Sequence, residues 1–204
     1  MEWFPVFLNL RNRLALIVGG GEVAMRKGLA MREAGARLRV VAPTIAPELA
    51  AAAAECHRRP ATADDLAPDV DLVVLATDAT EVQAELQRLA RDRRIWCNRC
   101  DEPETSDFTT GSVCERPPVI AAVMSSGCPG LSRLLKQRIA GVITPAVADL
   151  ARLLVEVRPR VKARFPTQHE RAAFFRRWTT EDVVRRAETE GLTTLRGELL
   201  AALT

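Results

Sequence analysis

The sequence predicts an α/β fold, in which an N-terminal Rossmann-like, doubly wound parallel sheet precedes a small β-containing section and a C-terminal helical tail. Two observations predict the sheet. Short apolar runs alternate with helix-like segments over the first 112 residues, and the first run ends directly in three glycines. Strands separated by helices of this length are joined by right-handed crossovers, which produce a parallel sheet.

Continuous apolar runs are typical of strands that are buried on both faces. The strands expected on this basis are 14–18, 38–42, the weaker 56–59, 71–76 and 95–98. The intervening segments 22–34, 48–55 and 80–92 are expected to be helices. Gly35 is placed to end the first helix, and Pro43 ends the second strand.

The pattern changes near Asp107, after which two strand candidates, 108–114 and 119–124, are joined by a turn-like Glu-Arg-Pro-Pro segment. From Leu131 onward the sequence predicts helices to the end, broken near Pro145, Pro159 and Pro166. We therefore divide the chain into residues 1–112, 113–145 and 146–204.

Composition excludes several classes of protein. Hydrophobic residues make up 48% and charged residues 27%, which predicts a buried core rather than disorder. No uncharged apolar run approaches the roughly 18–20 residues needed to cross a bilayer. The first residues do not resemble a signal peptide, and five cysteines do not suggest a disulfide scaffold. We expect a reduced, cytoplasmic protein with no membrane partner.

Charge is unevenly distributed. Residues 1–112 carry 14 basic and 17 acidic side chains, whereas residues 113–204 carry 15 basic and 9 acidic ones. Of the 29 basic residues 26 are arginines, which bind carboxylates or phosphates through paired contacts. The absence of tyrosine and the few other aromatic residues disfavour a nucleic-acid partner. A polyanionic small molecule and a merely solvated basic surface both stay open.

The glycine turn after the first strand reads GGGEVA and fits the G-x-G-x-x-G/A dinucleotide fingerprint. Gly19 permits the tight turn, Gly21 lets the backbone approach a pyrophosphate, and Ala24 allows close packing of helix on strand. The helix beginning at Glu22 and Val23 offers unpaired N–H groups to phosphates. The turn therefore predicts a bound dinucleotide; the alternative is a plain strand–helix connection.

Two further pairs of residues are candidates for the same cofactor. The acidic residue that usually ends the second strand and binds a ribose is missing, and Pro43 and Thr44 stand there instead. This leaves NAD versus NADP open. Thr77 and Asp78 follow the strand predicted to end at residue 76, at the carboxyl edge where ligands bind in such sheets. A helix-capping loop is an equally good interpretation of this pair.

Taken in order, these segments resemble the siroheme synthase N-terminal family, which comprises precorrin-2 dehydrogenases, some of which are also sirohydrochlorin ferrochelatases. The similar segments are FPVFLNL at 4–10, LIVGGGEVA at 16–24 with RK at 26–27, EAGA at 33–36, VAP at 41–43, ATD at 76–78, CN at 97–98 with Asp101, SSG at 125–127, and RVK at 160–162 with RF at 164–165. The resemblance covers nearly the whole chain, which makes it more specific than the glycine turn alone.

The resemblance implies oxidation of precorrin-2 to sirohydrochlorin by NAD, with ferrous iron as a further substrate where the chelatase activity exists. It also implies a homodimer, with residues 113–145 forming the subunit contact and residues 146–204 covering the tetrapyrrole. Precorrin-2 carries eight carboxylates, so it offers the basic second half a partner.

Asp101 is the candidate catalytic residue. It follows the strand predicted to end at residue 98, at the cofactor edge of the sheet, where a carboxylate can accept the proton that accompanies hydride removal. It also matches the catalytic aspartate of the family. Without the resemblance, it would be interpreted as an ordinary loop acid beside Glu102 and Glu104.

Asn98, Ser125, Ser126 and Gly127 are the candidate substrate-binding residues. The two serines and Gly127 lie between a predicted strand and a predicted helix, so their hydroxyl and N–H groups can bind a carboxylate. Ser126 matches a family serine near the tetrapyrrole. The next residues are GCPG where relatives often carry a longer Thr-Ser-Pro-type stretch, which leaves the pocket shape and any chelatase role open.

The sequence allows two alternatives to an NAD-dependent enzyme. Cys97-x-x-Cys100 invites a redox or zinc interpretation, but no second ligand pair is present, so no metal site is predicted. The second alternative is a non-catalytic NAD(H) sensor, with a basic tail that binds DNA or a partner. The tail shows no clear helix-turn-helix signature, which disfavours it.

Overall fold

The computed structural model describes residues 3–204 and divides into two compact units, the first ending at Thr110 and the second spanning Gly111–Thr204. We predicted the first division after residue 112. Each unit has its own apolar core.

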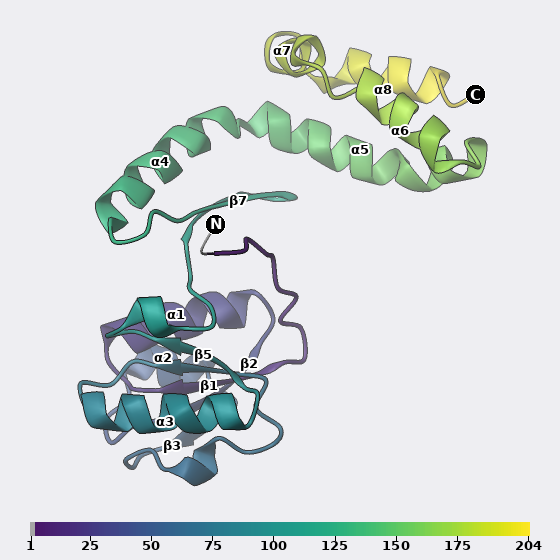
Figure 1. The fold of residues 1–204 in the computed structure, drawn as a ribbon. Helices are drawn as coiled ribbons and strands as arrows, with labels where there is room; N and C mark the ends of the chain where they lie inside the picture. The colour runs from purple at the N-terminus through teal and green to yellow at the C-terminus, as the bar shows by residue number, and fades with distance from the viewer. Residues whose placement is uncertain (1–2) are drawn as a thin grey trace. The chain divides into compact units, whose positions relative to one another are not determined.

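The first unit is built on a five-stranded parallel sheet with the order β3-β2-β1-β4-β5 (Figure 1). The strands are β1 (Leu14–Val18), β2 (Arg37–Val41), β3 (Glu55–His57), β4 (Leu72–Leu75) and β5 (Trp96–Arg99). The predicted α/β class and Rossmann-like sheet are confirmed. The strand order reverses between β1 and β4, which is where ligands bind in doubly wound sheets.

Helices cover both faces of this sheet (Figure 1). They are α1 (Glu22–Glu33), α2 (Pro47–Ala52) and α3 (Thr80–Asp92), with short 3₁₀ helices η1 (Ala63–Asp65) and η2 (Pro103–Thr105). Ala15 and Ile17 of β1 pack in one core with α1 and α2, while Leu14, Leu16 and Val18 pack in the other with α3. This strict alternation along β1 explains why the strand reads as continuously apolar.

Glycine is required where β1 ends. Gly19 has a φ of 129°, and a Cβ there would lie 2.1 Å from the carbonyl oxygen of Ala76, which follows β4. A Cβ on Gly20 would lie 1.9 Å from the carbonyl oxygen of Thr44, which follows β2. The turn therefore fits between the loops after β2 and β4 only because Gly19 and Gly20 have no side chains. The three loops lie in direct contact as a result.

The second unit begins with an antiparallel hairpin, β6 (Ser112–Arg116) and β7 (Val119–Val123), against which α4 (Pro129–Val142) packs. Four helices complete it: α5 (Pro145–Arg164), α6 (Gln168–Arg177), α7 (Glu181–Thr189) and α8 (Leu192–Ala201). No helix among residues 3–204 combines the length and apolarity needed to span a bilayer.

The first strand of the hairpin starts later than residue 108, where we predicted it. Phe108 instead belongs to the first unit, because its side chain packs on the core beneath α1 and its carbonyl accepts a 2.9 Å hydrogen bond from the Asn98 amide. Apolar character at residue 108 thus reports packing on the first sheet rather than membership of the hairpin.

The helix break predicted near Pro159 is wrong, because α5 continues through it. Proline removes the hydrogen bond to the carbonyl four residues earlier, that of Val155. Val155 is 60% exposed, which places this position on the solvent side of the helix. Val157 and Val161, on either side of the proline, are buried in the helical core and hold the two halves of α5 in one line.

Replacing Gly19 with alanine should destabilise the first unit by at least about 2 kcal/mol, because the new Cβ overlaps the Ala76 carbonyl and the backbone conformation is one that only glycine adopts readily. Urea unfolding followed by circular dichroism measures this change. Gly21→Ala is the matched control, since a Cβ there meets no atom within 4 Å. Equal stability of the two variants would contradict the role assigned to Gly19.

Candidate active site

The candidate site lies at the carboxyl edge of the sheet, around the start of α1. Gly21 is the N-cap residue of this helix, and no side chain of the described residues caps it. Gly21 has an extended backbone, and space is open where its Cβ would stand. Exposed N–H groups at a helix N-terminus, beside a backbone that a ligand can approach closely, form a suitable cradle for a pyrophosphate.

The residues predicted to contact the cofactor surround this turn. They are Glu22 and Val23 at the start of α1, Pro43 and Thr44 after β2, and Thr77 and Asp78 after β4. All are exposed except Thr77, which is half-buried. The Ala46 N–H donates a 2.9 Å hydrogen bond to the Gly20 carbonyl, which ties the loop after β2 to the turn. The structure therefore brings the predicted cofactor residues to one edge.

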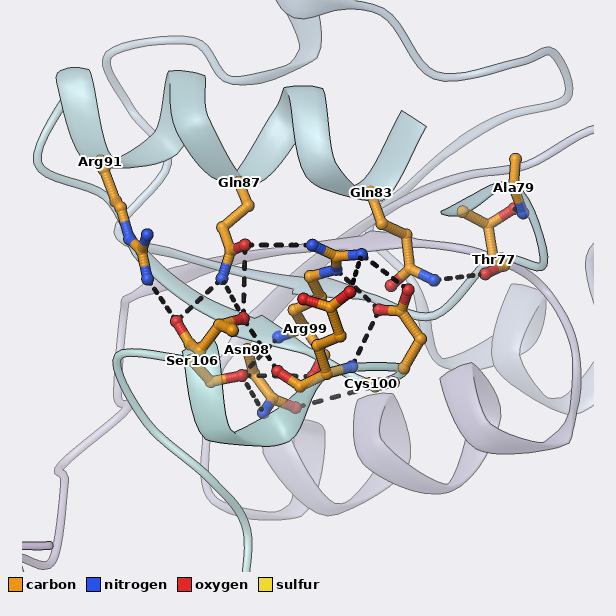
Figure 2. A network of polar contacts seen from close by, with 12 residues as sticks. Thr77, Ala79, Gln83, Gln87, Arg91, Asn98, Arg99, Cys100 and Ser106 are labelled. Atoms are coloured by element: carbon orange, nitrogen blue, oxygen red, sulfur yellow. Dashed lines mark hydrogen bonds and ion pairs between the residues drawn. The ribbon is translucent and has the colours of Figure 1, made fainter. Parts of the chain in front are cut away.

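Thr77 is also held from within the fold. The Gln83 amide nitrogen on α3 donates a 2.6 Å hydrogen bond to the Thr77 carbonyl, and the Ala79 N–H donates to the Thr77 hydroxyl at 3.5 Å (Figure 2). Gln83 is 2% exposed, and its Oε1 has no partner among the described residues. Thr77 thus takes part in starting α3, which is the alternative interpretation considered for this loop.

Asp101 follows β5 and projects its carboxylate at the same edge, with 27% of its side chain exposed. The guanidinium of Arg99 donates to both carboxylate oxygens, from Nε to Oδ1 at 2.8 Å and from Nη2 to Oδ2 at 2.9 Å. This paired hydrogen bond holds the pKa of Asp101 below its usual value. The carboxylate is therefore ionised and fixed in orientation.

Arg99 was not expected at the site, because the strand was predicted to end at residue 98. The structure extends β5 by one residue and pairs Arg99 with Leu75 at the end of β4. Arg99 is 5% exposed, although arginine is seldom buried without a partner. An arginine directly after a buried strand and two residues before the candidate aspartate is the signal that could have identified it.

Asn98, predicted to bind substrate, is 1% exposed. Its amide nitrogen donates to the Phe108 carbonyl and, at 3.5 Å, to the Ser106 hydroxyl, so the side chain fastens the segment after η2 to the strand (Figure 2). The Ser106 hydroxyl also accepts a 2.8 Å hydrogen bond from the Arg99 N–H. Direct contact between Asn98 and a substrate stays a prediction.

The five cysteines are all free thiols. Cys97 is fully buried, and burial, reinforced by the charge of Asp107, raises its pKa to about 12. A thiol that is neutral at physiological pH is a poor nucleophile.

Burial lowers the pKa of Lys27, whose Nζ donates a 2.8 Å hydrogen bond to the Thr110 hydroxyl. Among residues 3–204, no cluster of three or more ligating side chains is placed to hold a metal.

The serines predicted to bind substrate lie in the second unit, before α4. Ser125 is engaged there, since its N–H and hydroxyl contact the Ser132 hydroxyl at 2.9 and 2.7 Å. Ser126 and Gly127 are exposed, and Gly127 has a φ of 73°. The N-terminus of α4 has no side-chain cap among the described residues. These exposed groups are free to receive a carboxylate.

Comparison with known families gives two matches along the chain. Residues 6–112, more than half of the 204 residues, match the family described as putative NAD(P)-binding. Residues 146–203 match the family described as the sirohaem synthase dimerisation region. The first unit is therefore an NAD(P)-binding domain. The second description attaches dimerisation to residues 146–203, whereas we predicted the subunit contact in residues 113–145.

Curated relatives include several siroheme synthases. Siroheme synthase 1 of Aeromonas salmonicida is 38% identical over 200 residues, which covers 94% of this chain and 42% of the relative. The siroheme synthase of Thioalkalivibrio sulfidiphilus is 41% identical over 183 residues, covering 87% of this chain and 37% of the relative. The chain thus spans about two fifths of the length of these proteins.

Among solved structures, a chain described as SirC, precorrin-2 dehydrogenase, has a TM-score of 0.80 to this one. The similarity covers 98% of both chains at 19% sequence identity. At this level of identity the likeness establishes a shared fold from end to end.

Gly21→Ala should leave the thermal midpoint of the protein within a few degrees of the wild type but weaken NAD binding about tenfold or more, because the new methyl group projects into the open space beside the helix N-terminus. Isothermal titration calorimetry with NAD measures the affinity. Gly141→Ala in α4, which also has open space around it, is the control expected to keep both properties. Unchanged NAD affinity in Gly21→Ala would place the pyrophosphate elsewhere.

Proposed function

The chain belongs to the siroheme synthase N-terminal family, and we therefore propose that it catalyses the NAD-dependent dehydrogenation of precorrin-2 to sirohydrochlorin. The observation that carries the proposal is an ionised, oriented Asp101 carboxylate at the same sheet edge as the open glycine turn. A proton acceptor and a dinucleotide cradle at one edge are the two elements that such a reaction needs.

In the proposed reaction, precorrin-2 and NAD⁺ give sirohydrochlorin, NADH and a proton. NAD⁺, when bound, supplies the hydride acceptor. Asp101 receives the proton that the macrocycle releases and passes it to solvent, to which 27% of its side chain is open. Its ionised state matters, because a protonated carboxyl group cannot act as the acceptor.

The cofactor is proposed to lie across the turn between β1 and α1. The N–H groups of Glu22 and Val23 would hold the pyrophosphate, and the open space at Gly21 would leave room for it. The remaining proposed contacts are Pro43 and Thr44 on one side of the turn and Thr77 and Asp78 on the other.

The second unit supplies candidates for binding the substrate carboxylates. Several of its basic side chains are already engaged, such as Arg152 with Asp149 and Arg171 with the Phe165 carbonyl. Four exposed ones on α5 and α6 have no hydrogen-bond, ion-pair or cation–π partner among the described residues: Arg160, Lys162, Arg176 and Arg177. We assign these four, with Ser126 and Gly127, to the recognition of substrate carboxylates.

We also propose a homodimer in a reducing, cytoplasmic setting. The hairpin exposes Val113 and Ile120, and α4 exposes Leu131 and Leu134 three residues apart on one face. Exposed apolar side chains that gather on neighbouring elements are typical of a protein interface. The five free thiols are compatible with a reducing compartment.

Asp101→Asn should lower precorrin-2 turnover about a hundredfold or more while NAD affinity stays within about threefold, because the amide cannot accept the proton. The assay is anaerobic, with enzymatically made precorrin-2 and NAD⁺, and follows NADH and sirohydrochlorin absorbance. The fold should survive, since Glu102 still faces Arg99.

Ferrous iron added after the dehydrogenation is complete tests whether the wild-type protein inserts the metal faster than the uncatalysed rate.

Glu104→Gln is the matched control, since it removes an exposed acid from the same loop and should leave turnover unchanged. A wild-type protein that binds NAD but does not turn over precorrin-2 would overturn the proposed function. Salt-sensitive binding of duplex DNA together with this result would favour the NAD(H)-sensing alternative.

Ile120→Asp should convert the dimer to a monomer at micromolar concentration, because a buried, unpaired carboxylate is costly in an apolar interface. Sedimentation velocity measures the change. Val155→Asp on α5, which is also exposed, tests the helical region instead. Dissociation by Val155→Asp alone would move the contact into residues 146–203, and a monomeric wild type would contradict the proposed dimer.

A further inference from the structure

Arg99 places a cation in an almost fully buried position directly beside the candidate catalytic residue. Only 6% of its side chain is exposed. Burying a charge is costly unless its hydrogen bonds are satisfied by well-placed partners. The burial of this guanidinium therefore has to be explained by its partners.

Its partners come from two directions. Asp101 receives two parallel hydrogen bonds, and Glu102 accepts a third from Nη2 at 3.1 Å. From α3, the Gln87 amide oxygen lies 3.5 Å from Nη1 (Figure 2). The two carboxylates together carry more charge than the guanidinium, so the cation is fully compensated.

Gln87 is itself fixed, which makes the guanidinium rigid. Its amide nitrogen donates to the carbonyl and hydroxyl oxygens of Thr105 at 2.9 and 3.0 Å, and Arg91 donates to the same carbonyl (Figure 2). Gln87 is 5% exposed. The loop after β5 and helix α3 therefore hold the Arg99 guanidinium from two sides, with η2 fixing Gln87 in turn, and the paired contact transfers this rigidity to the Asp101 carboxylate.

The hydrogen bonds distinguish the two oxygens of Asp101. Oδ1 accepts from Arg99 Nε and also from the Glu102 N–H at 3.1 Å. Oδ2 accepts from Arg99 Nη2 alone among the described residues. Because a carboxylate oxygen has two lone-pair directions, Oδ2 is the atom that keeps one free for a proton.

Other charges around Asp101 are more distant or of the opposite effect. Glu102 is a like charge on the same loop, and Cys100 is a half-buried thiol between Asp101 and α1. The charges of Arg26 and Lys27 on α1 both lower the pKa of the Cys100 thiol. On α3, the side chain that contacts Arg99 is the neutral Gln87. Arg99 is the strongest influence on the Asp101 pKa, and it lowers it.

We propose that Arg99 is the positioning residue of the site: it keeps the Asp101 carboxylate ionised and presents Oδ2 as the atom that accepts the substrate's proton. This rests on the proposed dehydrogenase function. Arg99 acts through Asp101 and does not itself touch the reacting atoms.

The test compares Arg99→Gln and Arg99→Lys with the wild type in the precorrin-2 assay. In Arg99→Gln, kcat should fall about tenfold or more, the KM for precorrin-2 should stay within about twofold, and the acid limb of the kcat profile should move to higher pH. In Arg99→Lys the charge remains but the paired geometry is lost, so kcat should fall with a smaller movement of the acid limb.

Arg88→Gln on the exposed side of α3 is the control for removing an arginine, and it should match the wild type. Carbon-13 NMR of labelled aspartate carboxyls adds a readout that needs no turnover, since the titration of Asp101 should move to higher pH in Arg99→Gln. If this variant does not fold, Arg99→Lys carries the test through its kcat.

Superimposable pH profiles and an unmoved Asp101 titration in a folded Arg99 variant would overturn the positioning role while leaving the dehydrogenase intact. Absence of wild-type turnover would overturn the proposed function, and the proposal with it. An inactive Asp101→Asn beside a fully active Arg99→Gln would show that the carboxylate needs no positioning partner.

Discussion

The carboxyl edge of the first sheet depends on a backbone contact that only glycine allows. The turn after β1 lies against the carbonyl groups of the loops after β2 and β4, at distances that no side chain could occupy. Three loops are thereby gathered at the point where the strand order reverses. Because the switch point is where such sheets bind ligands, this packing constraint also determines where the site lies.

The space around the backbone of this turn changes within two residues. Gly19 and Gly20 are closed in by backbone, whereas space is open at Gly21, where α1 begins without a side-chain cap. The first two glycines therefore serve the fold, and the third serves a ligand. A sequence fingerprint of three glycines does not separate these roles, but the distances do.

Apolar runs were sufficient to predict four of the five strands of the first unit and the place of Asp101 after the last of them, because both follow from burial and from where a parallel strand ends. The weak strand expected at 56–59 exists as β3, although its residues form no apolar run. The start of the hairpin was misplaced because Phe108 is apolar for a different reason, its packing on the first sheet. The helix break predicted at Pro159 is wrong because local propensity says nothing of the buried valines around it. Arg99 was missed because the strand was predicted to end one residue too early, and its contact with Gln87, twelve residues earlier on α3, does not follow from local patterns.

A cation beside a proton acceptor makes the carboxylate a weaker base, which by itself works against proton transfer. Loss of a hydride, however, leaves positive charge on the macrocycle, and a proton on such a cation is strongly acidic. Base strength is then less important than having the carboxylate ionised and correctly turned when the hydride departs. A buried arginine held between its own loop and α3 provides both conditions, at the cost of proton affinity that this reaction does not need.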